Sequence, residues 1–172
     1  MPYIISQIAG GIVFVLVFLS MQTKNITKVM LTQIGCNALG MLSYVLLVGF
    51  SACGICFVAT VQSTIFFFLR KYDKENPIWL TPVIFAAYIL CSVLTYQGPL
   101  DLIPMLAALL CALGLTQKNP TNYRIIMLLN GATWVVYDVF IAAYTMLATH
   151  GFTVASALLG LIRLDILKKK SE

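Results

Sequence analysis

The chain has 172 residues, of which 60% are hydrophobic and only 10% are charged, and its mean hydropathy is +0.94. A soluble domain is about 25% charged, so this composition excludes a soluble protein and indicates an integral membrane protein. The net charge of +5 does not indicate a nucleic-acid-binding protein, because the basic residues lie in short clusters between apolar segments.

Apolar segments about as long as a spanning helix, roughly 20 residues, follow one another along the chain. Residues 4–21 form the first, and we expect no cleavable signal peptide because no Lys or Arg precedes this segment. Residues 29–69 are too long for one span. We expect this segment to turn back within residues 49–54, where two glycines interrupt it.

Residues 78–96 and 100–116 form a fourth and a fifth segment. Residues 125–167 are again too long for one helix, and we expect a break at residues 149–151, which read Thr-His-Gly. The sequence therefore predicts an all-α membrane protein with seven transmembrane helices.

The basic residues alternate between the predicted loops. The loops after the first, third and fifth spans and the C-terminus contain Lys24, Lys28, Arg70, Lys71, Lys74, Lys118, Arg124, Arg163 and Lys168 to Lys170. The other connections contain no Lys or Arg, and the only charged or titratable residues that we expect there are Asp101 and His150. The positive-inside rule then predicts an outer N-terminus and an inner C-terminus.

The sequence also contains an internal repeat, in which residues of one type recur 93 residues later, as Asn37 recurs at Asn130. The same spacing pairs Tyr44 with Tyr137, Thr60 with Thr153, Ser63 with Ser156 and Arg70 with Arg163. One further residue of shift pairs Lys24-Asn25 with Lys118-Asn119 and Gly10 with Pro104.

We therefore expect a single membrane domain over residues 1–172, made of a three-helix repeat (1–72), a linker helix (77–97) and a second three-helix repeat (99–170). This 3+1+3 arrangement places both repeats in the same orientation. Parallel repeats are typical of transporters, which bind their solute near the bilayer midplane between the repeats. A duplication that only stabilises a helix bundle would leave the same pattern.

Polar residues share helix faces in the second, third, sixth and seventh spans, and such faces are expected to point to other helices or to a wet cavity. The candidate solute-binding residues on them are Asn37, Tyr44, Thr60, Ser63, Asn130, Trp134, Tyr137, Asp138, Thr153 and Ser156. The alternative for the amides is hydrogen bonding between helices. For the hydroxyls, the alternative is hydrogen bonding to helix carbonyls.

Asp138 is the most specific of these signals, since an Asp at mid-helix costs roughly 2.5–3.5 kcal/mol on insertion. No basic residue is predicted at its depth. We expect Asp138 to be protonated, hydrated in a cavity, or hydrogen-bonded to a neighbour such as Tyr137, with a proton-linked or ligand-binding role. Its partner at the 93-residue spacing is Val45, so that role would belong to one repeat only.

No metal, cofactor or catalytic group is expected. Cys53 and Cys56 form a C-x-x-C, but no second pair accompanies them and His150 is the only histidine, which leaves too few ligands for zinc. The five cysteines are better explained as small buried apolar residues. No Ser–His or paired-carboxylate arrangement is visible, so we do not expect an enzyme.

The chain resembles the YgjV-type bacterial inner-membrane proteins over nearly its full length. The matching motifs are Gln7-x-x-Gly10, the basic loop after the first span, Trp134-x-x-Tyr137-Asp138 and Leu161-Ile162-Arg163.

More distantly, the 3+1+3 layout and the W-x-x-Y at Trp134 resemble the SWEET sugar facilitators and the related PnuC vitamin transporters. That resemblance implies that Trp134 helps to hold a sugar. Thr60 and Thr153 stand where SWEET proteins have an Asn pair, and only Pro104 matches the proline of each repeat, with Gly10 opposite.

The function expected from these features is an inner-membrane transporter or facilitator for a sugar, vitamin or similar small polar solute, working by alternating access between the repeats. The alternative is a non-transporting membrane receptor or assembly protein on the same scaffold. The expected partners are the lipid bilayer and the solute, with no nucleic acid, and the sequence is compatible with a homo-oligomer.

Overall fold

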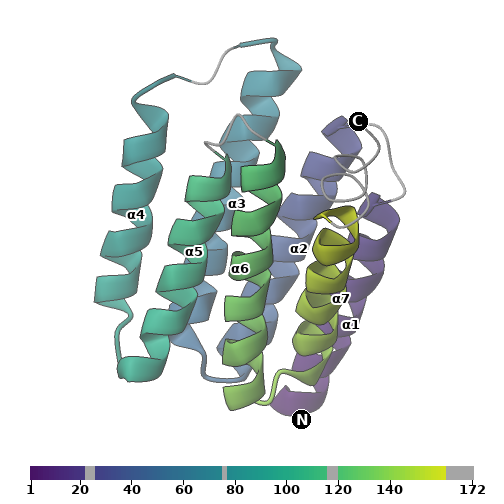
Figure 1. The fold of residues 1–172 in the computed structure, drawn as a ribbon. Helices are drawn as coiled ribbons and strands as arrows, with labels where there is room; N and C mark the ends of the chain where they lie inside the picture. The colour runs from purple at the N-terminus through teal and green to yellow at the C-terminus, as the bar shows by residue number, and fades with distance from the viewer. Residues whose placement is uncertain (22–25, 75–76, 116–119, 162–172) are drawn as a thin grey trace.

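A computed structural model describes residues 1–21, 26–74, 77–115 and 120–161 (Figure 1). These residues form seven α-helices, one short 3-10 helix and no strand, which confirms the predicted all-α fold. The elements are α1 (Pro2–Met21), α2 (Ile26–Leu46), α3 (Phe50–Lys71), α4 (Leu80–Leu94), η1 (Pro99–Asp101), α5 (Leu102–Leu115), α6 (Pro120–Phe140) and α7 (Tyr144–Leu161).

Most of the basic residues that we predict in loops, or their side chains, lie outside the described part of the chain. Lys24, Lys118, Arg163 and Lys168 to Lys170 lie outside the described residues, as do the side chains of Lys28, Arg70 and Arg124. The basic residues Lys71 and Lys74, at the end of α3, are exposed. The orientation across the membrane therefore stays a prediction.

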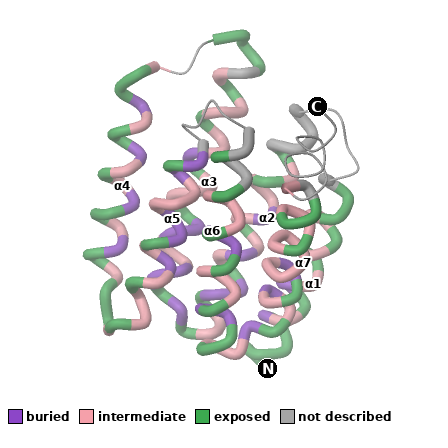
Figure 2. Tube along the Cα trace, in the orientation of Figure 1, coloured by how far each residue is buried: buried purple, intermediate pink, exposed green. Residues whose placement is uncertain are grey.

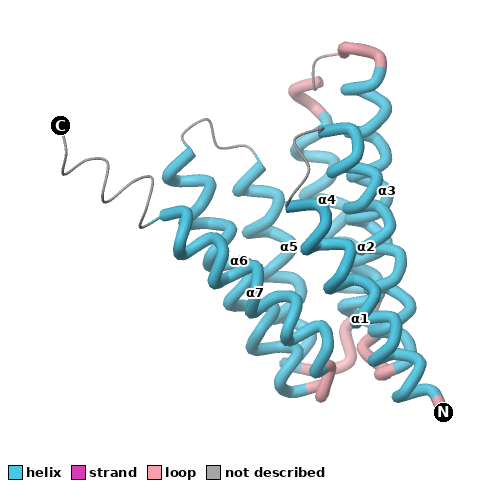
Figure 3. Tube along the Cα trace, turned by 90° about the vertical axis from the view of Figure 1, so that its right-hand side faces the viewer, coloured by secondary structure: helices cyan, strands magenta, loops and turns pink. Residues whose placement is uncertain are grey.

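The helices form a ring in which α1 packs on α2, α2 on α3, α5 on α6, and α6 on α7 (Figures 1 and 3). The contact of α1 with α7 closes the ring on one side, and the contact of α3 with α5 closes it on the other. α4 lies outside the ring and packs mainly against α3 and α5 (Figure 1). Its buried residues Leu80, Ile84 and Tyr88 form a core cluster with Ile55 and Ala108.

Buried and exposed positions follow one another along the helices (Figure 2). The buried positions include polar residues such as Ser6, Asn130 and Asp138, whereas many large apolar side chains are exposed. Among the described residues, no buried side-chain nitrogen or oxygen lacks a hydrogen-bond partner. Polar groups that face lipid are costly unless they are satisfied internally, so this distribution fits a membrane protein.

By length and composition alone, two helices are able to cross a membrane, within Pro2–Leu19 and Phe50–Leu69. Four further apolar helical segments are shorter, namely Leu31–Leu46, Leu80–Leu94, Pro99–Gly114 and Ile125–Phe140. The seven helices are thus present in the described chain, while seven membrane crossings stay a prediction.

The two long apolar segments turn back at residues 47–49 and 141–143. The turn expected within residues 49–54 therefore comes earlier, and the break expected at residues 149–151 is wrong. Each turn places a non-glycine residue in the left-handed conformation, Val48 with φ 62° and Ala142 with φ 54°. The next amide closes each turn, from Gly49 N–H to the Tyr44 carbonyl at 2.9 Å and from Ala143 N–H to the Asp138 carbonyl at 2.9 Å.

These two turns are 94 residues apart, since Ala142 corresponds to Val48 and Ala143 to Gly49. The 93-residue spacing is therefore wrong by one residue for the helices that flank the turns. A few identities scattered through apolar helices do not fix a register, whereas the hydrogen bonds of a turn do. The counterpart of Asp138 is accordingly Tyr44 and not Val45.

Candidate functional site

A cavity of about 410 Å³ lies between the six helices of the ring. Tyr88 of α4 also reaches it. Its polar and aromatic lining consists of Thr32, Gln33, Asn37, Tyr44, Gln62, Tyr88, Asn130, Trp134, Thr149, His150 and Thr153.

The cavity is closed at one end of the bundle, here called the turn end, where residues 47–49 and 141–143 lie. Tyr44, Ala52, Tyr137 and Ala143 are each at most 1% exposed and pack together there. Towards the opposite end, here called the open end, Gln33 is exposed. The helix groups also diverge in that direction (Figure 3). Among the described residues, the cavity wall is therefore tightly packed at the turn end and extends to an exposed side chain at the open end.

At the closed end, Asp138 joins side chains from three helices. Its Oδ1 accepts a hydrogen bond from the Tyr44 hydroxyl at 2.8 Å, and its Oδ2 lies 2.6 Å from His150 Nδ1. The expected partner, Tyr137, is not bonded to it in this way, and His150 lies within α7 rather than in an outer loop. A basic residue is therefore present at the depth of Asp138, contrary to the sequence-based expectation.

Asp138 and His150 differ in their access to the cavity. The Asp138 side chain is fully buried and is not part of the cavity wall. The His150 side chain is 20% exposed and lines the cavity. The imidazole therefore separates the carboxylate from the cavity.

Trp134 is held by aromatic rings on several sides. Its ring centroid lies 5.7 Å from that of Tyr44, at an interplanar angle of 19°, and 5.4 Å from that of His150, at 20°. Tyr137 meets it edge-on at 6.1 Å. Trp134 also packs against both hydrophobic core clusters, so its orientation in the cavity wall is fixed.

The two predicted amides line the cavity and also connect helices. Asn37 donates to Ser63 Oγ of α3 at 3.3 Å and accepts from Gln33 at 3.2 Å. Asn130 donates to the Ala107 carbonyl of α5 at 2.5 Å. Hydrogen bonding between helices is thus confirmed for both amides. Both side chains also line the cavity, and their binding of a solute stays a prediction.

The other predicted site residues divide into two groups. Thr153 lines the cavity, although its hydroxyl donates to the Thr149 carbonyl at 3.0 Å. Thr60 donates to the Cys56 carbonyl at 2.8 Å, as expected of a hydroxyl that satisfies its own helix. The residues that the structure does not place in the cavity wall are Thr60, Ser63, Tyr137, Asp138 and Ser156.

Several cavity residues were missed from the sequence. His150 was assigned to a loop because the α6–α7 turn was misplaced. Gln62 and Tyr88 were not considered, yet the Tyr88 hydroxyl donates to Gln62 Oε1 at 2.6 Å beside the cavity. The correct turn register would have revealed His150, since it places this residue on the helix face that also carries Met146 and Thr153.

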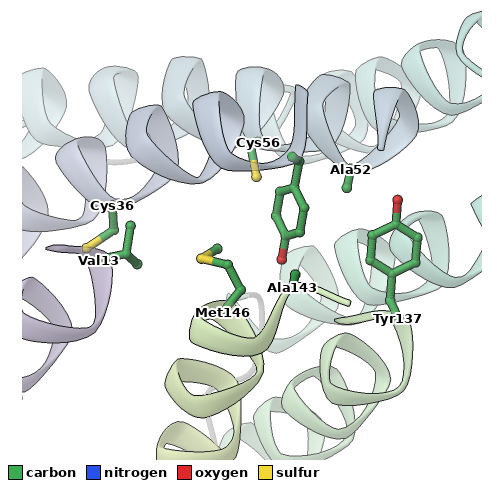
Figure 4. Close-up of a cluster of buried hydrophobic side chains, with 8 residues drawn as sticks. Val13, Cys36, Ala52, Cys56, Tyr137, Ala143 and Met146 are labelled. Carbon is green, nitrogen blue, oxygen red and sulfur yellow. The ribbon is translucent and has the colours of Figure 1, made fainter. Parts of the chain in front are cut away.

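Sulfur-containing side chains form another part of the wall. Cys36, Cys56 and Met146 come from three helices, and they belong with Val13 to one core cluster (Figure 4). All five cysteines are free. No group of three or more His, Cys, Asp or Glu residues that could hold a metal ion occurs in the described part of the chain.

The cavity wall repeats at the 94-residue spacing of the turns. Pairs in which both members line the cavity are Val17 with Cys111, Gln33 with Met127, Cys36 with Asn130, Asn37 with Gly131, Gly40 with Trp134, Ile55 with Thr149, Cys56 with His150, and Ala59 with Thr153. Tyr44 and Asp138 are also 94 residues apart, and the hydrogen bond between them joins the two halves. The two halves of the chain thus surround the cavity with equivalent positions.

No curated protein and no solved structure matches the chain, so the resemblance to SWEET and PnuC transporters stays a prediction. The family model described as Imp-YgjV, bacterial inner membrane protein, matches residues 4–168. This match covers nearly the whole chain, and the apolar helices with their buried polar groups agree with it. The chain belongs to the Imp-YgjV family and is a bacterial inner membrane protein.

Proposed function

We propose that the protein is a transporter or facilitator that moves a small polar solute across the inner membrane. In this proposal, residues 1–72 and 99–170 are two three-helix units joined by a linker helix at residues 77–97, and they rock about the central cavity. The observation that carries the proposal is the cavity itself, which has equivalent positions of both halves in its wall and is closed at only one end.

The contacts that hold the turn end closed also correspond at the 94-residue spacing. Between α7 and α1, the Thr145 hydroxyl donates to Gln7 Oε1 at 3.0 Å. At the matching positions, the Ser51 hydroxyl of α3 donates to the Asp101 carbonyl at 3.3 Å. Alternating access by a symmetric pair of units needs such paired contacts, because opening the turn end would release both together.

The lining favours an uncharged polar solute. The cavity wall contains no Lys, Arg, Asp or Glu among the described residues, and it offers amides, hydroxyls and the indole of Trp134. Amides hydrogen-bond hydroxyl and amide groups, and a volume of about 410 Å³ suits a small molecule. If the positive-inside rule applies, the open end faces the cytoplasm.

A ligand screen tests the binding step. Purified protein would be melted in the presence of sugars, nucleosides, vitamins and amino acids, beside Asn37→Ala and the control Thr133→Ala. Thr133 lies outside the cavity wall and bonds the Leu129 carbonyl of its own helix. We expect one class of compound to stabilise wild type and Thr133→Ala equally and Asn37→Ala much less. No stabilisation across the panel would contradict the proposal.

Flux of the identified solute into proteoliposomes tests the transport step. We expect saturable flux that Asn37→Ala reduces in parallel with binding. Saturable binding without flux would instead favour a non-transporting receptor on the same scaffold, which the tightly packed turn end also permits.

A further inference from the structure

We propose that Asp138 and His150 form a proton-binding site at the wall of the cavity, and that the proton held there keeps the turn end closed through Tyr44. The proton site stands on its own geometry, while its effect on opening rests on the proposed transport function. No part of the sequence pattern indicated this pair, because His150 was expected in a loop.

The charge of Asp138 requires a partner. The carboxylate is fully buried and has two neutralising contacts at most, the Tyr44 hydroxyl at 2.8 Å and His150 Nδ1 at 2.6 Å. A buried carboxylate is costly unless a positive charge pairs with it. Tyr44 donates a hydrogen bond but brings no positive charge, so the Asp138–His150 pair is neutral only when it holds one proton beyond that of the neutral imidazole, on either the imidazole or the carboxyl group.

The other titratable groups around the pair offer no substitute. They are Tyr44 from α2, Cys56 from α3, Tyr137 from α6 and, next to Tyr137, Asp101 of η1. Each of these groups is either neutral or negative, whichever way it titrates. His150 is therefore the one cationic partner among the described groups that face Asp138.

The geometry also gives the proton a route. His150 Nδ1 faces Asp138, and the imidazole lines the cavity while the carboxylate does not. A proton from cavity water binds the neutral imidazole, and the product is an imidazolium–carboxylate pair with no net charge. Histidine is suited to this exchange because it titrates near neutral pH.

Loss of this proton would loosen the closed end. It leaves a net negative charge on a fully buried carboxylate, which is then stabilised only by hydrogen bonds from the Tyr44 hydroxyl and from Nδ1–H of the neutral His150 imidazole. Water reaches the carboxylate most directly if Tyr44 and Asp138 separate. Since these two residues hold equivalent positions in the two halves, their separation is also the first step in opening the turn end.

Tryptophan fluorescence tests the proton site without any solute, because a protonated imidazole quenches a stacked indole. The chain has two tryptophans, so Trp79→Phe leaves Trp134, 5.4 Å from the His150 ring, as the reporter. In lipid nanodiscs we expect Trp134 emission to fall through one transition as the pH is lowered. His150→Gln should abolish the transition, and Asp138→Asn should move it toward acidic pH because it removes the negative charge beside the imidazole. Emission that does not change with pH, or a transition unaffected by Asp138→Asn, would overturn the proton site.

Thiol labelling tests the effect on opening. Cys56 lines the cavity, and Cys36→Ser, Cys53→Ser, Cys91→Ala and Cys111→Ala together leave it as the single thiol. We expect a membrane-impermeant maleimide, added at the turn end, to label Cys56 several-fold faster above the fluorescence transition than below it, after correction for reagent reactivity. In Tyr44→Phe the difference should disappear while the fluorescence transition is kept. Equal rates on both sides of the transition would overturn the link to opening. A normal transition in a protein that shows no flux would leave the proton site standing and contradict only the transport function.

Discussion

The two halves of the cavity wall have the same geometry and different chemistry. At equivalent positions of the wall, the first half has Gly40 and Cys56, and the second half has Trp134 and His150. Tyr44, which also lines the cavity, corresponds to Asp138, which is buried behind the wall. The shared geometry suits a movement to which both halves contribute equally. The unequal side chains confine the ionisable pair and the indole ring to the second half, so the proposed proton site would belong to one half of a symmetric frame.

Removing the central carboxylate should have the largest effect. Asp138→Ala leaves the cavity-lining imidazole of His150 and the buried hydroxyl of Tyr44 without their acceptor, and we expect it to lower the free energy of unfolding by about 3 kcal/mol. Tyr44→Phe, at the equivalent position, removes one hydrogen bond and should cost about 1 kcal/mol. Reversible denaturation in detergent micelles measures both. Equal losses would mean that the two positions are chemically alike, against the comparison drawn above.

Two adjacent glycines of α1 give the next largest effect. A Cβ on Gly10 would overlap the Thr145 side chain of α7, whereas a Cβ on Gly11 has no atom within 4 Å. Gly10→Ala should cost about 1–3 kcal/mol because it pushes the halves apart. Gly11→Ala is the matched control and should stabilise the helix by up to about 1 kcal/mol. Melting temperatures that rise equally in both variants would show that α1 and α7 are not in close contact.

Gly40, the counterpart of Trp134, allows a milder test of the cavity wall. A Cβ on Gly40 would lie 3.4 Å from Met146 Cε and 3.5 Å from Cys56 Sγ, which is close but acceptable packing. Gly40→Ala should therefore change stability by less than about 0.5 kcal/mol. It should nevertheless weaken binding of the largest solutes found in the screen, because it fills cavity space. Unchanged binding of every solute would place the solute elsewhere.

The smallest effect on solute binding should come from the turns, because Val48 and Ala142 do not line the cavity. Val48 and Ala142 both adopt the left-handed conformation, which costs a residue with a Cβ roughly 1–2 kcal/mol. Glycine relieves this cost but loses more chain entropy on folding. We expect Val48→Gly to stabilise by up to about 1 kcal/mol and Ala142→Gly by less, since Val is β-branched. Destabilisation by Val48→Gly in thermal melts would contradict this account of the turns.

The sequence predicted the helices well and the turns poorly. Hydropathy fixes where apolar helices run, and all seven were expected. The turns were expected at glycine-rich or Thr-His-Gly segments, but Val48 and Ala142 close them with backbone hydrogen bonds that leave no compositional signal. That error placed His150 in a loop.

The candidate site was predicted only in part, because the same error in the turns hid some of its residues. Helical spacing correctly grouped Asn130, Trp134 and Asp138 on the inner face of α6. The partners of Asp138 come from α2 and α7, and contacts between helices depend on a register that apolar sequences leave almost undetermined. For this reason, the 93-residue spacing that pairs Asn37 with Asn130 and Tyr44 with Tyr137 is one residue shorter than the spacing of the two turns in the structure.

A reversible cross-link of the turn end tests the central claim most directly. The Cβ position of Gly10 lies 3.0 Å from Thr145 Cβ, so Gly10→Cys with Thr145→Cys, in a background without the native cysteines, needs a shift of only about 0.5 Å to form a disulfide. In proteoliposomes, oxidation should stop flux of the screened solute while binding from the open end persists, and reduction should restore flux. Flux that continues at full rate with the disulfide formed would contradict alternating access through this cavity.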